Sequence, residues 1–390
     1  MGDDRTPLVS ADPGPTIAVV GAGMGGLTAA AALASVGCQV QVFEQAPAFA
    51  RVGAGIQLGA NGARTIAPFG IVPALRELTS PMETVQYRTA DTDELLTELP
   101  GGEAHEAAYG APFLQLHRGD LHAHLTTMVS PESVHLGKRL RDLRHAAEDV
   151  ELVFEDGTSF RADGVVGADG LHSRVLEILF GATPARYSGK VAYRTVFPVS
   201  LLPAGTVQRT TKWVGPDRHI VIYTITRGEE VYFVTSVPES DPAGDSWSAK
   251  GDMGTLRQSF EGFPETVQIV LKGCPEVWRW GIYVRDPLPR WVDGPVALLG
   301  DACHPMTPWM AQGAGMAMED AVVLARCVAG GGPLAQAMER YERTRHERAS
   351  RVQVTSATNP LMGKDDLTWL YGYDAWTVPL ADEGSHHAAR

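Results

Sequence analysis

Residues 16–44 read TIAVVGAGMGGLTAAAALASVGCQVQVFE, and this stretch decides the fold. Its apolar start predicts a buried strand, its alanine-rich middle favours a helix, and its apolar end predicts a second strand. Gly37 lies where a glycine commonly ends a helix. The order of strand, glycine turn, helix and strand predicts a βαβ unit.

Gly21, Gly23 and Gly26 form a GxGxxG pattern directly after the first predicted strand. In such a pattern the first glycine permits a tight turn, the second lets the backbone approach a pyrophosphate, and the third lets the helix lie close to the strand. Glu44 closes the second strand, where an acidic side chain binds ribose hydroxyls and repels the 2′-phosphate of NADP. The stretch therefore predicts a dinucleotide site, without deciding between FAD and NAD.

The composition is that of a compact acidic protein. With 390 residues and 44% hydrophobic content, the chain can build one large or two intermediate domains. Its net charge of −13 comes from interspersed charges, which disfavours a nucleic-acid surface. The apolar runs are too short for a spanning helix and the start lacks a secretory apolar region, so we expect a cytoplasmic protein without a membrane partner.

The cysteines are scattered, with neither a CxxC pair nor a nearby His at metal-ligand spacing. They are Cys38, Cys274, Cys303 and Cys327. We therefore expect reduced, mostly buried thiols and no metal site.

Residues 189–281 differ from the rest of the chain because they are rich in Val, Ile, Thr and Tyr. The segments KVAYRTVF, RTTKWVG, HIVIYTIT and EEVYFVTSV predict an antiparallel sheet, and residues 84–99 have a similar strand character. Residues 134–170 predict three short strands. Later, VALLGD predicts a buried strand that leads through a loop to a helix over about residues 315–328.

Two further segments predict local structure before this region. Residues 51–66, RVGAGIQLGANGARTI, predict a glycine-rich loop beside a ligand that becomes helical near its end. A second helix begins near residue 120, where apolar side chains recur along one face. The residues of that face are Leu121, Leu125, Met128 and Val129.

Two later motifs bear on the choice of dinucleotide. They are GADGLHSRV, which contains Asp169, and LLGDACHPMTPWMAQGAGMAMEDA, which contains Asp301. In the second, a buried strand delivers the Asp301 carboxylate, which can accept a ribitol hydroxyl, and a glycine-rich turn leads into a helix N-terminus. This arrangement suits a pyrophosphate and the edge of a flavin where negative charge accumulates on reduction, so it favours FAD.

Taken in order, the three motifs resemble those of the group A flavoprotein monooxygenases, the p-hydroxybenzoate hydroxylase-like family, over nearly the whole chain. The resemblance implies an α/β, FAD-binding Rossmann-like fold with an inserted antiparallel-sheet substrate domain and C-terminal helices. It also implies FAD as cofactor, NADH or NADPH as co-substrate and O₂ as oxidant, with the Asp169 segment serving both FAD and NAD(P)H. The candidate cofactor-binding residues are Gly21, Gly23, Gly26, Glu44, Gln45, Arg51, Arg118, Asp169, Asp301, Gly313 and Ala314. For Arg51 the choice between touching FAD and steering a substrate carboxylate stays open.

The resemblance and the shifts in composition give a division of the chain. We expect a disordered tail over 1–14, an FAD-binding domain from 15–82, 108–187 and 286–335, a substrate domain from 83–107 and 188–285, and a C-terminal helical segment over 336–390.

Within the family, EQAPAFARVGAGIQLGAN, HRGDLH, DRHIVIY and WLYGYD are similar to the 6-hydroxynicotinate 3-monooxygenases and, more loosely, to salicylate hydroxylases. In such enzymes the reduced flavin captures O₂ as a C4a-hydroperoxide, which attacks a ring carbon ortho or para to a phenolate. When that carbon bears a carboxylate, CO₂ leaves. The resemblance thus implies decarboxylative hydroxylation of a hydroxylated aromatic carboxylate such as 6-hydroxynicotinate, by a monomer or homodimer. A salicylate- or hydroxybenzoate-type monooxygenase is the alternative.

His219 and Tyr223 are candidate catalytic and substrate-binding residues. They lie four apart in DRHIVIY, so on a strand they share one face. Our hypothesis is that they bind or deprotonate the substrate phenol, which helps electrophilic attack on the ring. The alternative is a core histidine and a packed tyrosine.

Three further positions complete the candidate substrate site. His304, in GDACHPM, is expected near the flavin, either as a catalytic and substrate-binding residue or as a packing residue. Gln57 and Thr210 stand where the nicotinate pattern has His and Cys, and Gln57 is typical of the salicylate-like relatives. These two positions therefore bear on the identity of the substrate.

Two other classes of function compete with this interpretation. One is another FAD enzyme of the same fold, such as an epoxidase, a halogenase or a geranylgeranyl-type reductase. The segment WRWGIY at 278–283 lacks the final proline of the halogenase pattern WxWxIP. The other is a non-catalytic regulator that binds flavin or NAD. A yellow protein whose NADH oxidation is stimulated by an aromatic acid would support the hydroxylase, and a colourless protein that retains no flavin would count against it.

Overall fold

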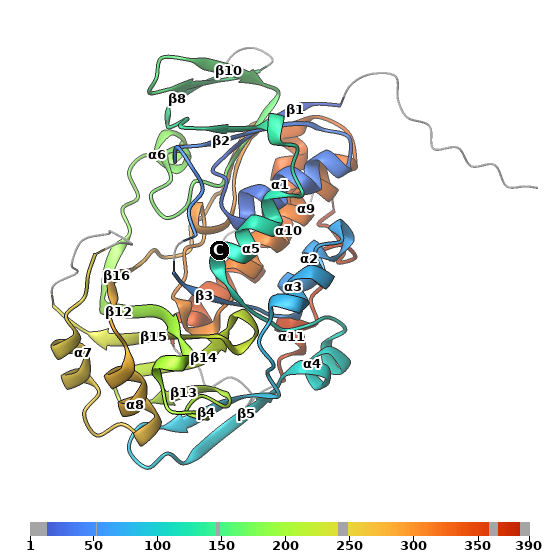
Figure 1. Ribbon diagram of the computed structural model, residues 1–390. Helices are drawn as coiled ribbons and strands as arrows, with labels where there is room; N and C mark the ends of the chain where they lie inside the picture. Colours follow the sequence, from blue (N-terminus) through green and yellow to red (C-terminus); the bar gives the residue numbers. More distant parts are fainter. Residues whose placement is uncertain (1–13, 52, 146–148, 241–248, 359–365, 383–390) are drawn as a thin grey trace, which may run out of the picture.

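The computed structural model describes residues 14–51, 53–145, 149–240, 249–358 and 366–382. The tail expected over 1–14 lies almost wholly outside these ranges. Two large sheets organise the described chain, one carrying the N-terminal βαβ unit and the other formed mainly by the central residues (Figure 1).

The first sheet has six strands, in the order β17-β18-β11-β1-β2-β7. Its core is parallel, and only the edge strand β17 runs antiparallel to its neighbour. The strands are β1 (Thr16–Val20), β2 (Gln39–Glu44), β7 (Val134–Leu136), β11 (Gly164–Gly167), β17 (Val292–Asp293) and β18 (Val296–Leu298). The βαβ unit predicted from residues 16–44 is confirmed.

Helix α1 (Met24–Ser35) is buried along most of its length, between this sheet and helix α9 (Gly313–Ala329). A helix that is apolar on all sides must be enclosed, and the short alanine side chains allow this close packing. A Cβ atom added to Gly25 would lie 2.9 Å from the Cβ of Ala317 on α9. Gly37 has a φ of +92° just beyond the helix, as the sequence predicted.

The second sheet has seven strands, in the order β16-β12-β15-β14-β13-β4-β5. It is antiparallel except for the pair β13 and β4. The strands are β4 (Thr84–Thr89), β5 (Leu95–Pro100), β12 (Arg186–Pro198), β13 (Thr210–Val214), β14 (His219–Ile225), β15 (Glu230–Pro238) and β16 (Trp278–Val284). The central antiparallel sheet is thus confirmed.

Two helices cover one face of the seven-stranded sheet. They are α7 (Met253–Ser259) and α8 (Glu265–Gly273), and their apolar side chains form a core with Ile220 and Ile222 of β14. The sequence analysis did not predict these helices. The other face of the sheet is turned toward β3, β6 and the loop after β18.

Several local predictions need correction. The loop predicted over residues 51–66 contains a strand, β3 (Gly55–Leu58), because it pairs with the distant β6 (Leu114–His117). Residues 134–170 form five strands rather than three, since turns at Gly137 and Asp163 divide them. Three of the five lie outside the first sheet, namely β8 (Leu140–His145), β9 (Val150–Phe154) and β10 (Ser159–Ala162).

Helix α5 (Arg118–Thr126) ends before two residues of its predicted face. Met128 and Val129 lie in the turn beyond it and still pack against the core. The remaining helices are α2 (Ala60–Ile66), α3 (Val72–Leu78), α4 (Gly102–Tyr109), α6 (Arg174–Phe180), α10 (Leu334–Ala357) and α11 (Thr368–Tyr371). The C-terminal segment is therefore helical in α10 and α11, and residues 372–382 continue without a helix.

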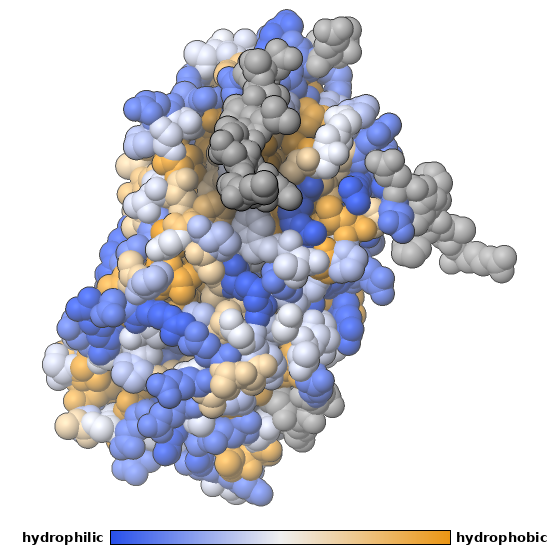
Figure 2. All heavy atoms as spheres, turned by 90° about the vertical axis from the view of Figure 1, so that its right-hand side faces the viewer, coloured by the Kyte–Doolittle hydropathy of each residue, from blue (hydrophilic) through white to orange (hydrophobic). Residues whose placement is uncertain are grey.

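The distribution of the two sheets supports the division into an FAD-binding and a substrate domain, whose boundaries stay a prediction. On the face of the molecule in Figure 2, hydrophilic residues dominate and hydrophobic ones gather only in small groups. Among the described residues, no helix is long and apolar enough to cross a membrane. All four cysteines are buried and free.

Candidate active site

The glycine turn between β1 and α1 leaves open space at the N-terminus of the helix. Gly21 has a φ of +103°, which a side chain rarely adopts, and a Cβ on Gly26 would lie 1.9 Å from the oxygen of Gly21. A Cβ on Gly23, in contrast, would meet no described atom within 4 Å. The turn is thus closely packed at Gly26 and open at Gly23. An anion bound at a helix N-terminus requires such an open side.

Glu44 is fixed beside this turn at the end of β2. Its carboxylate accepts hydrogen bonds from the backbone N–H groups of Ala22, at 2.9 Å, and Ala46, at 2.8 Å. Each carboxylate oxygen keeps a further lone pair. Glu44 is therefore placed to accept ribose hydroxyls, and the adjoining Gln45 is exposed.

Asp301, Arg118 and the start of α9 lie near one another. The Asp301 side chain is solvent-accessible, yet its surroundings raise the pKa of its carboxyl by desolvation. Burial lowers the pKa of Arg118, and attraction to Asp301 opposes this. Gly313 opens α9, and a Cβ there would lie 3.9 Å from Oδ1 of Asp301, with Ala314 the next residue of the helix.

Neither Asp301 nor Arg118 makes a side-chain hydrogen bond to any residue that the structure describes. A carboxylate, a guanidinium and a helix N-terminus with unused hydrogen-bonding capacity fit a ligand that has hydroxyl and anionic groups. With the open glycine turn, they fit FAD.

Asp169 has a different environment. Its carboxylate accepts hydrogen bonds from Ser173 Oγ at 2.6 Å, from the backbone N–H of Arg174 at 2.7 Å and from that of Val175 at 3.1 Å. It thereby caps the N-terminus of α6. Its direct contact with the cofactor stays a prediction, while the geometry supports a role in holding the turn after β11.

Arg51 lies at the surface with its side chain 50% exposed. Its Nε contacts Oδ1 of Asp120 at 2.8 Å, and its Nη2 lies 3.6 Å from Oε2 of Glu230. Both predicted roles of Arg51, toward FAD and toward a substrate carboxylate, stay open.

His219 and Tyr223 lie on the face of β14 that is turned away from α7 and α8. The imidazole of His219 lies edge-on to the indole of Trp309, in the loop after β18, with ring centroids 4.5 Å apart. Tyr223 lies edge-on to Tyr232 of β15 at 5.2 Å. Burial lowers the pKa of His219 and raises that of Tyr223, so both are neutral near pH 7. A neutral imidazole can accept a proton and a neutral phenol can donate a hydrogen bond.

Two cationic residues that the sequence analysis missed share this face. Lys212 of β13 lies opposite Val221 of β14. Val221 in turn lies opposite Val234 of β15, whose other neighbour is Arg194 of β12. Directly opposed residues in an antiparallel pair point to the same side. Lys212 and Arg194 therefore flank the half-buried valines in one row.

Both cations are buried, and burial weakens their hold on the proton. It lowers the pKa of Lys212 to about 7, with Lys190 adding to the effect, and that of Arg194 to about 10. Arg194 also stacks over the Trp280 ring at 4.4 Å. A lysine inside the predicted strand RTTKWVG was the available sequence signal.

Gln57 and Thr210 meet at a residue that was also missed, Gln115 of β6. Gln57 Nε2 donates to Gln115 Oε1 at 2.8 Å, and Thr210 Oγ1 donates to the same atom at 2.6 Å. Gln115 is only 1% exposed. The two positions that bear on the substrate are thus joined through one carbonyl oxygen.

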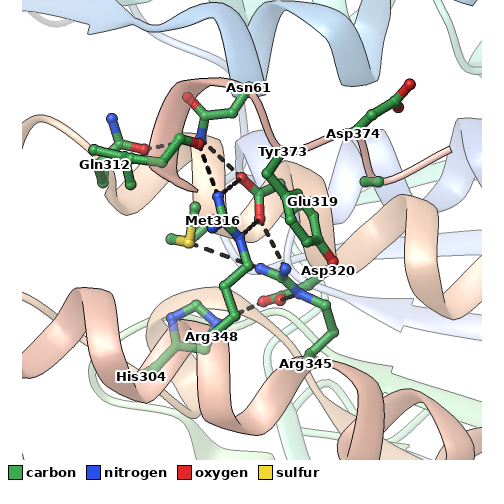
Figure 3. A network of polar contacts seen from close by, with 12 residues as sticks. Asn61, His304, Gln312, Met316, Glu319, Asp320, Arg345, Arg348, Tyr373 and Asp374 are labelled. Atoms are coloured by element: carbon green, nitrogen blue, oxygen red, sulfur yellow. Dashed lines mark hydrogen bonds and ion pairs between the residues drawn. The ribbon is translucent and has the colours of Figure 1, made fainter. Parts of the chain in front are cut away.

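His304 does not join this group. Figure 3 shows its side chain beside a buried ion-pair network between α9 and α10. Its Nε2 lies 2.5 Å from Oδ2 of Asp320, whose other oxygen accepts from Nε of Arg345 at 2.8 Å. Arg345 also contacts Glu319 at 2.7 Å, and Arg348 binds that same carboxylate. Burial alone would raise the pKa of Asp320, but His304 and Arg345 lower it to about 2.

The expected catalytic and substrate-binding role of His304 stays a prediction, and this geometry favours a structural role for it. The neighbouring Cys303 has its thiol pKa raised by burial, so it is protonated. Cys303, His304 and Asp320 place ligand-type atoms within 4.8 Å of one another, but the Asp320 carboxylate is already held by His304 and Arg345.

Fold and site together define a flavin-binding protein with a second, largely antiparallel sheet. The sequence profile of the family described as FAD binding domain matches residues 15–356. The chain is 42% identical to the 6-hydroxynicotinate 3-monooxygenase of Pseudomonas fluorescens, covering 94% of this chain and 97% of that one. It is 36% identical to the 3-amino-4-hydroxybenzoate 2-monooxygenase of Streptomyces cremeus, with the same coverage. A salicylate hydroxylase substrate complex superposes with a TM-score of 0.80 at 25% identity, over 93% of this chain and 96% of that one.

The chain therefore belongs to the FAD-binding family of group A, p-hydroxybenzoate hydroxylase-like monooxygenases. It is an FAD-dependent aromatic monooxygenase that uses NAD(P)H and O₂. The interpretation as a non-catalytic regulator is set aside, because the relatives are enzymes over nearly the full length of the chain.

Proposed function

We propose that the protein catalyses decarboxylative hydroxylation of a hydroxylated aromatic or heteroaromatic carboxylate, with 6-hydroxynicotinate as the leading substrate. The observation that carries this proposal is the single sheet face that holds His219, Tyr223, Lys212 and Arg194. It combines proton-accepting, hydrogen-bonding and cationic groups. The similarity to 6-hydroxynicotinate 3-monooxygenase also supports it.

His219 and Tyr223 are assigned to the substrate hydroxyl. The imidazole is assigned to accept the phenolic proton and the buried tyrosine to orient the oxygen, which leaves an electron-rich ring. Burial and the nearby Lys212 and Lys190 lower the pKa of His219 and so oppose this transfer. Trp309 packs edge-on against His219 and so fixes the imidazole from the side of the cofactor loop.

Lys212 and Arg194 are assigned to the substrate carboxylate. An anion that enters a buried cationic row gains a strong interaction because little water screens it. The half-buried valines between the cations provide an apolar floor for the ring. An aromatic acid combines the apolar ring and the negative charge that this row accommodates.

FAD would be held by the α1 N-terminus, Glu44, Arg118, Asp301 and the α9 N-terminus. The chemistry it supplies when bound is activation of O₂ after reduction by NAD(P)H. In the overall reaction one oxygen atom of O₂ replaces the carboxyl group on the ring, the other leaves as water, the ring–carboxyl bond breaks to release CO₂, and NAD(P)H is oxidised.

The second candidate is a hydroxybenzoate-type monooxygenation in which the carboxylate stays on the ring. The hydrogen-bonded Gln57, Gln115 and Thr210 favour it, because neutral amides and a hydroxyl can bind an uncharged hydroxyl or amino substituent of such a benzoate. The similarity to 3-amino-4-hydroxybenzoate 2-monooxygenase agrees with this candidate.

A substrate panel tests the proposal. Hydroxylated benzoates and pyridine carboxylates are added to the FAD-loaded enzyme, stimulated NAD(P)H oxidation is recorded, and CO₂ release is measured for each active acid. The proposal expects 6-hydroxynicotinate to stimulate oxidation and to release CO₂. Stimulation by hydroxybenzoates without CO₂ favours the second candidate, and no stimulation by any acid contradicts both.

A further inference from the structure

We propose that Gln115 is a specificity-determining positioning residue, which holds Gln57 and Thr210 in one amide–hydroxyl cluster that selects substrates carrying a hydroxyl or amino substituent at this end of the site. This inference rests on the proposed function and deepens it. It is carried by the convergence of these side chains from three separate strands.

The cluster borders the space above the substrate face. Continuing the printed pairing of Thr211 with Ile222 by one residue brings Thr210 opposite Tyr223. On β3, Gly55 lies two residues before Gln57 and so shares its face. A Cβ on Gly55 would lie 2.8 Å from the Tyr223 hydroxyl and 2.5 Å from the Tyr232 ring. The cluster and the Tyr223 hydroxyl therefore face the same region.

Shared hydrogen bonds determine which atoms of the cluster remain as donors and which remain as acceptors. The carbonyl oxygen of Gln115 has two lone pairs, and Gln57 and Thr210 each donate to that oxygen. This leaves the amide N–H groups of Gln115 as donors and the carbonyl oxygen of Gln57 as an acceptor. Gln57 is half-buried and Gln115 is buried, so Gln57 is the more accessible of the two amides.

A ligand group that suits this arrangement must both donate and accept. Hydroxyl and amino substituents do so, whereas a hydrogen atom leaves the buried amides unpaired and a carboxylate faces the carbonyl oxygen of Gln57. A site built to hydrogen-bond a substrate group rejects analogues that lack it much more strongly than an apolar site does. The cluster therefore acts on a ring substituent near the Tyr223 hydroxyl, beside the cationic row, because Thr210 lies two residues from Lys212 on the same face of β13.

The test compares the binding of matched aromatic acids, without turnover. The dissociation constants of 3-amino-4-hydroxybenzoate, 4-hydroxybenzoate and 6-hydroxynicotinate are measured from the change in flavin absorbance of the FAD-loaded enzyme. The wild type is expected to bind 3-amino-4-hydroxybenzoate at least about tenfold more tightly than 4-hydroxybenzoate, because the amino group then gives the buried amides a hydrogen-bonding partner. The ratio of the dissociation constant of 4-hydroxybenzoate to that of 3-amino-4-hydroxybenzoate should fall to about threefold or less in Gln115→Leu and in Thr210→Val.

The variants form a cycle with its own controls. Because Gln57 and Thr210 act through one oxygen, Thr210→Val should change the ratio no further once Gln115 is leucine. Thr210→Ser restores the hydroxyl and should restore the ratio. Gln86→Leu is the matched control, since Gln86 bonds Glu98 and faces the opposite side of the sheet. Thr210→Val is nearly isosteric, so it keeps the test valid if Gln115→Leu does not fold.

The outcomes separate this inference from the proposed function. An unchanged ratio in Thr210→Val, or a wild-type ratio below about twofold, overturns the inference and leaves the proposed function standing. A wild type that binds none of the three acids overturns both.

Discussion

The imidazole of His219 and the indole of Trp309 meet edge-on with their ring centroids 4.5 Å apart. His219 belongs to the seven-stranded sheet, whereas Trp309 follows Asp301 in the loop after β18. This contact joins the substrate face to the cofactor loop. It places a neutral, buried imidazole where both meet.

Replacing His219 by alanine should uncouple the enzyme. Without the proton acceptor the ring is less reactive, and general-base groups typically contribute about 10²- to 10⁴-fold to a rate. We expect hydroxylated product to fall by at least about tenfold relative to NAD(P)H consumed, with hydrogen peroxide making up the difference. Product and NAD(P)H are quantified in the same reaction, with Trp309→Phe as a control that keeps an aromatic neighbour. Unchanged coupling in His219→Ala would rule out its assigned role.

The affinity for an aromatic carboxylate should fall as the pH rises through the pKa of Lys212, which is about 7. Below that pH the ammonium is charged and attracts the anion, and above it the amine is neutral. The dissociation constant of benzoate, which has no phenol to titrate, should therefore increase about tenfold from pH 6 to pH 8. Lys212→Met should bind benzoate weakly and with little dependence on pH. A flat wild-type profile, or the same slope in the variant, speaks against a carboxylate site at Lys212.

Gly23→Ala and Gly26→Ala should have different consequences. A Cβ at Gly23 meets no described atom within 4 Å, so the apoprotein should keep its melting temperature while FAD binds at least about tenfold more weakly, because the methyl group occupies space meant for the pyrophosphate. A Cβ at Gly26 would collide with the Gly21 oxygen at 1.9 Å, so this variant should lose stability as well. FAD titration and thermal unfolding distinguish these effects. Normal FAD affinity in Gly23→Ala would contradict the placement of the cofactor.

The network around Arg345 should contribute strongly to stability. Arg345 is fully buried with Asp320 and Glu319, so Arg345→Met leaves two buried carboxylates short of a partner. Breaking such a buried group typically costs about 3–5 kcal/mol of unfolding free energy. Urea denaturation of the apoprotein measures this loss. The exposed pair of Lys250 and Glu276 gives the control, since Lys250→Met should change stability by about 1 kcal/mol or less. Equal effects of the two substitutions would mean that the network is not a stabilising element.

The sequence predicted the parts of the fold that depend on local patterns. The βαβ unit of residues 16–44 and the strand-rich centre have periodicities that can be recognised within one segment. Strand β3 could not be recognised in this way, because it exists through pairing with β6, nearly 60 residues later.

The sequence predicted those parts of the site whose residues lie close together in the chain, and it missed those that only the fold brings together. The pair His219 and Tyr223 lies on one strand, so its shared face followed from a period of two. Lys212 and Arg194 came to lie in one row, with two valines between them, only through the register of β12 to β15. Gln115 became relevant only through two hydrogen bonds to other strands. His304 lies next to the predicted cofactor loop in sequence, but its hydrogen bond to Asp320 turns it toward the interior.

The most direct test of the central claim is a stoichiometry. FAD-loaded enzyme is given 6-hydroxynicotinate labelled in its carboxyl carbon, and NAD(P)H oxidised, labelled CO₂ released and hydroxylated ring formed are measured together. Decarboxylative hydroxylation predicts equal amounts of all three. A substrate that neither binds nor stimulates NAD(P)H oxidation, or a hydroxylated product that retains the label, would contradict it.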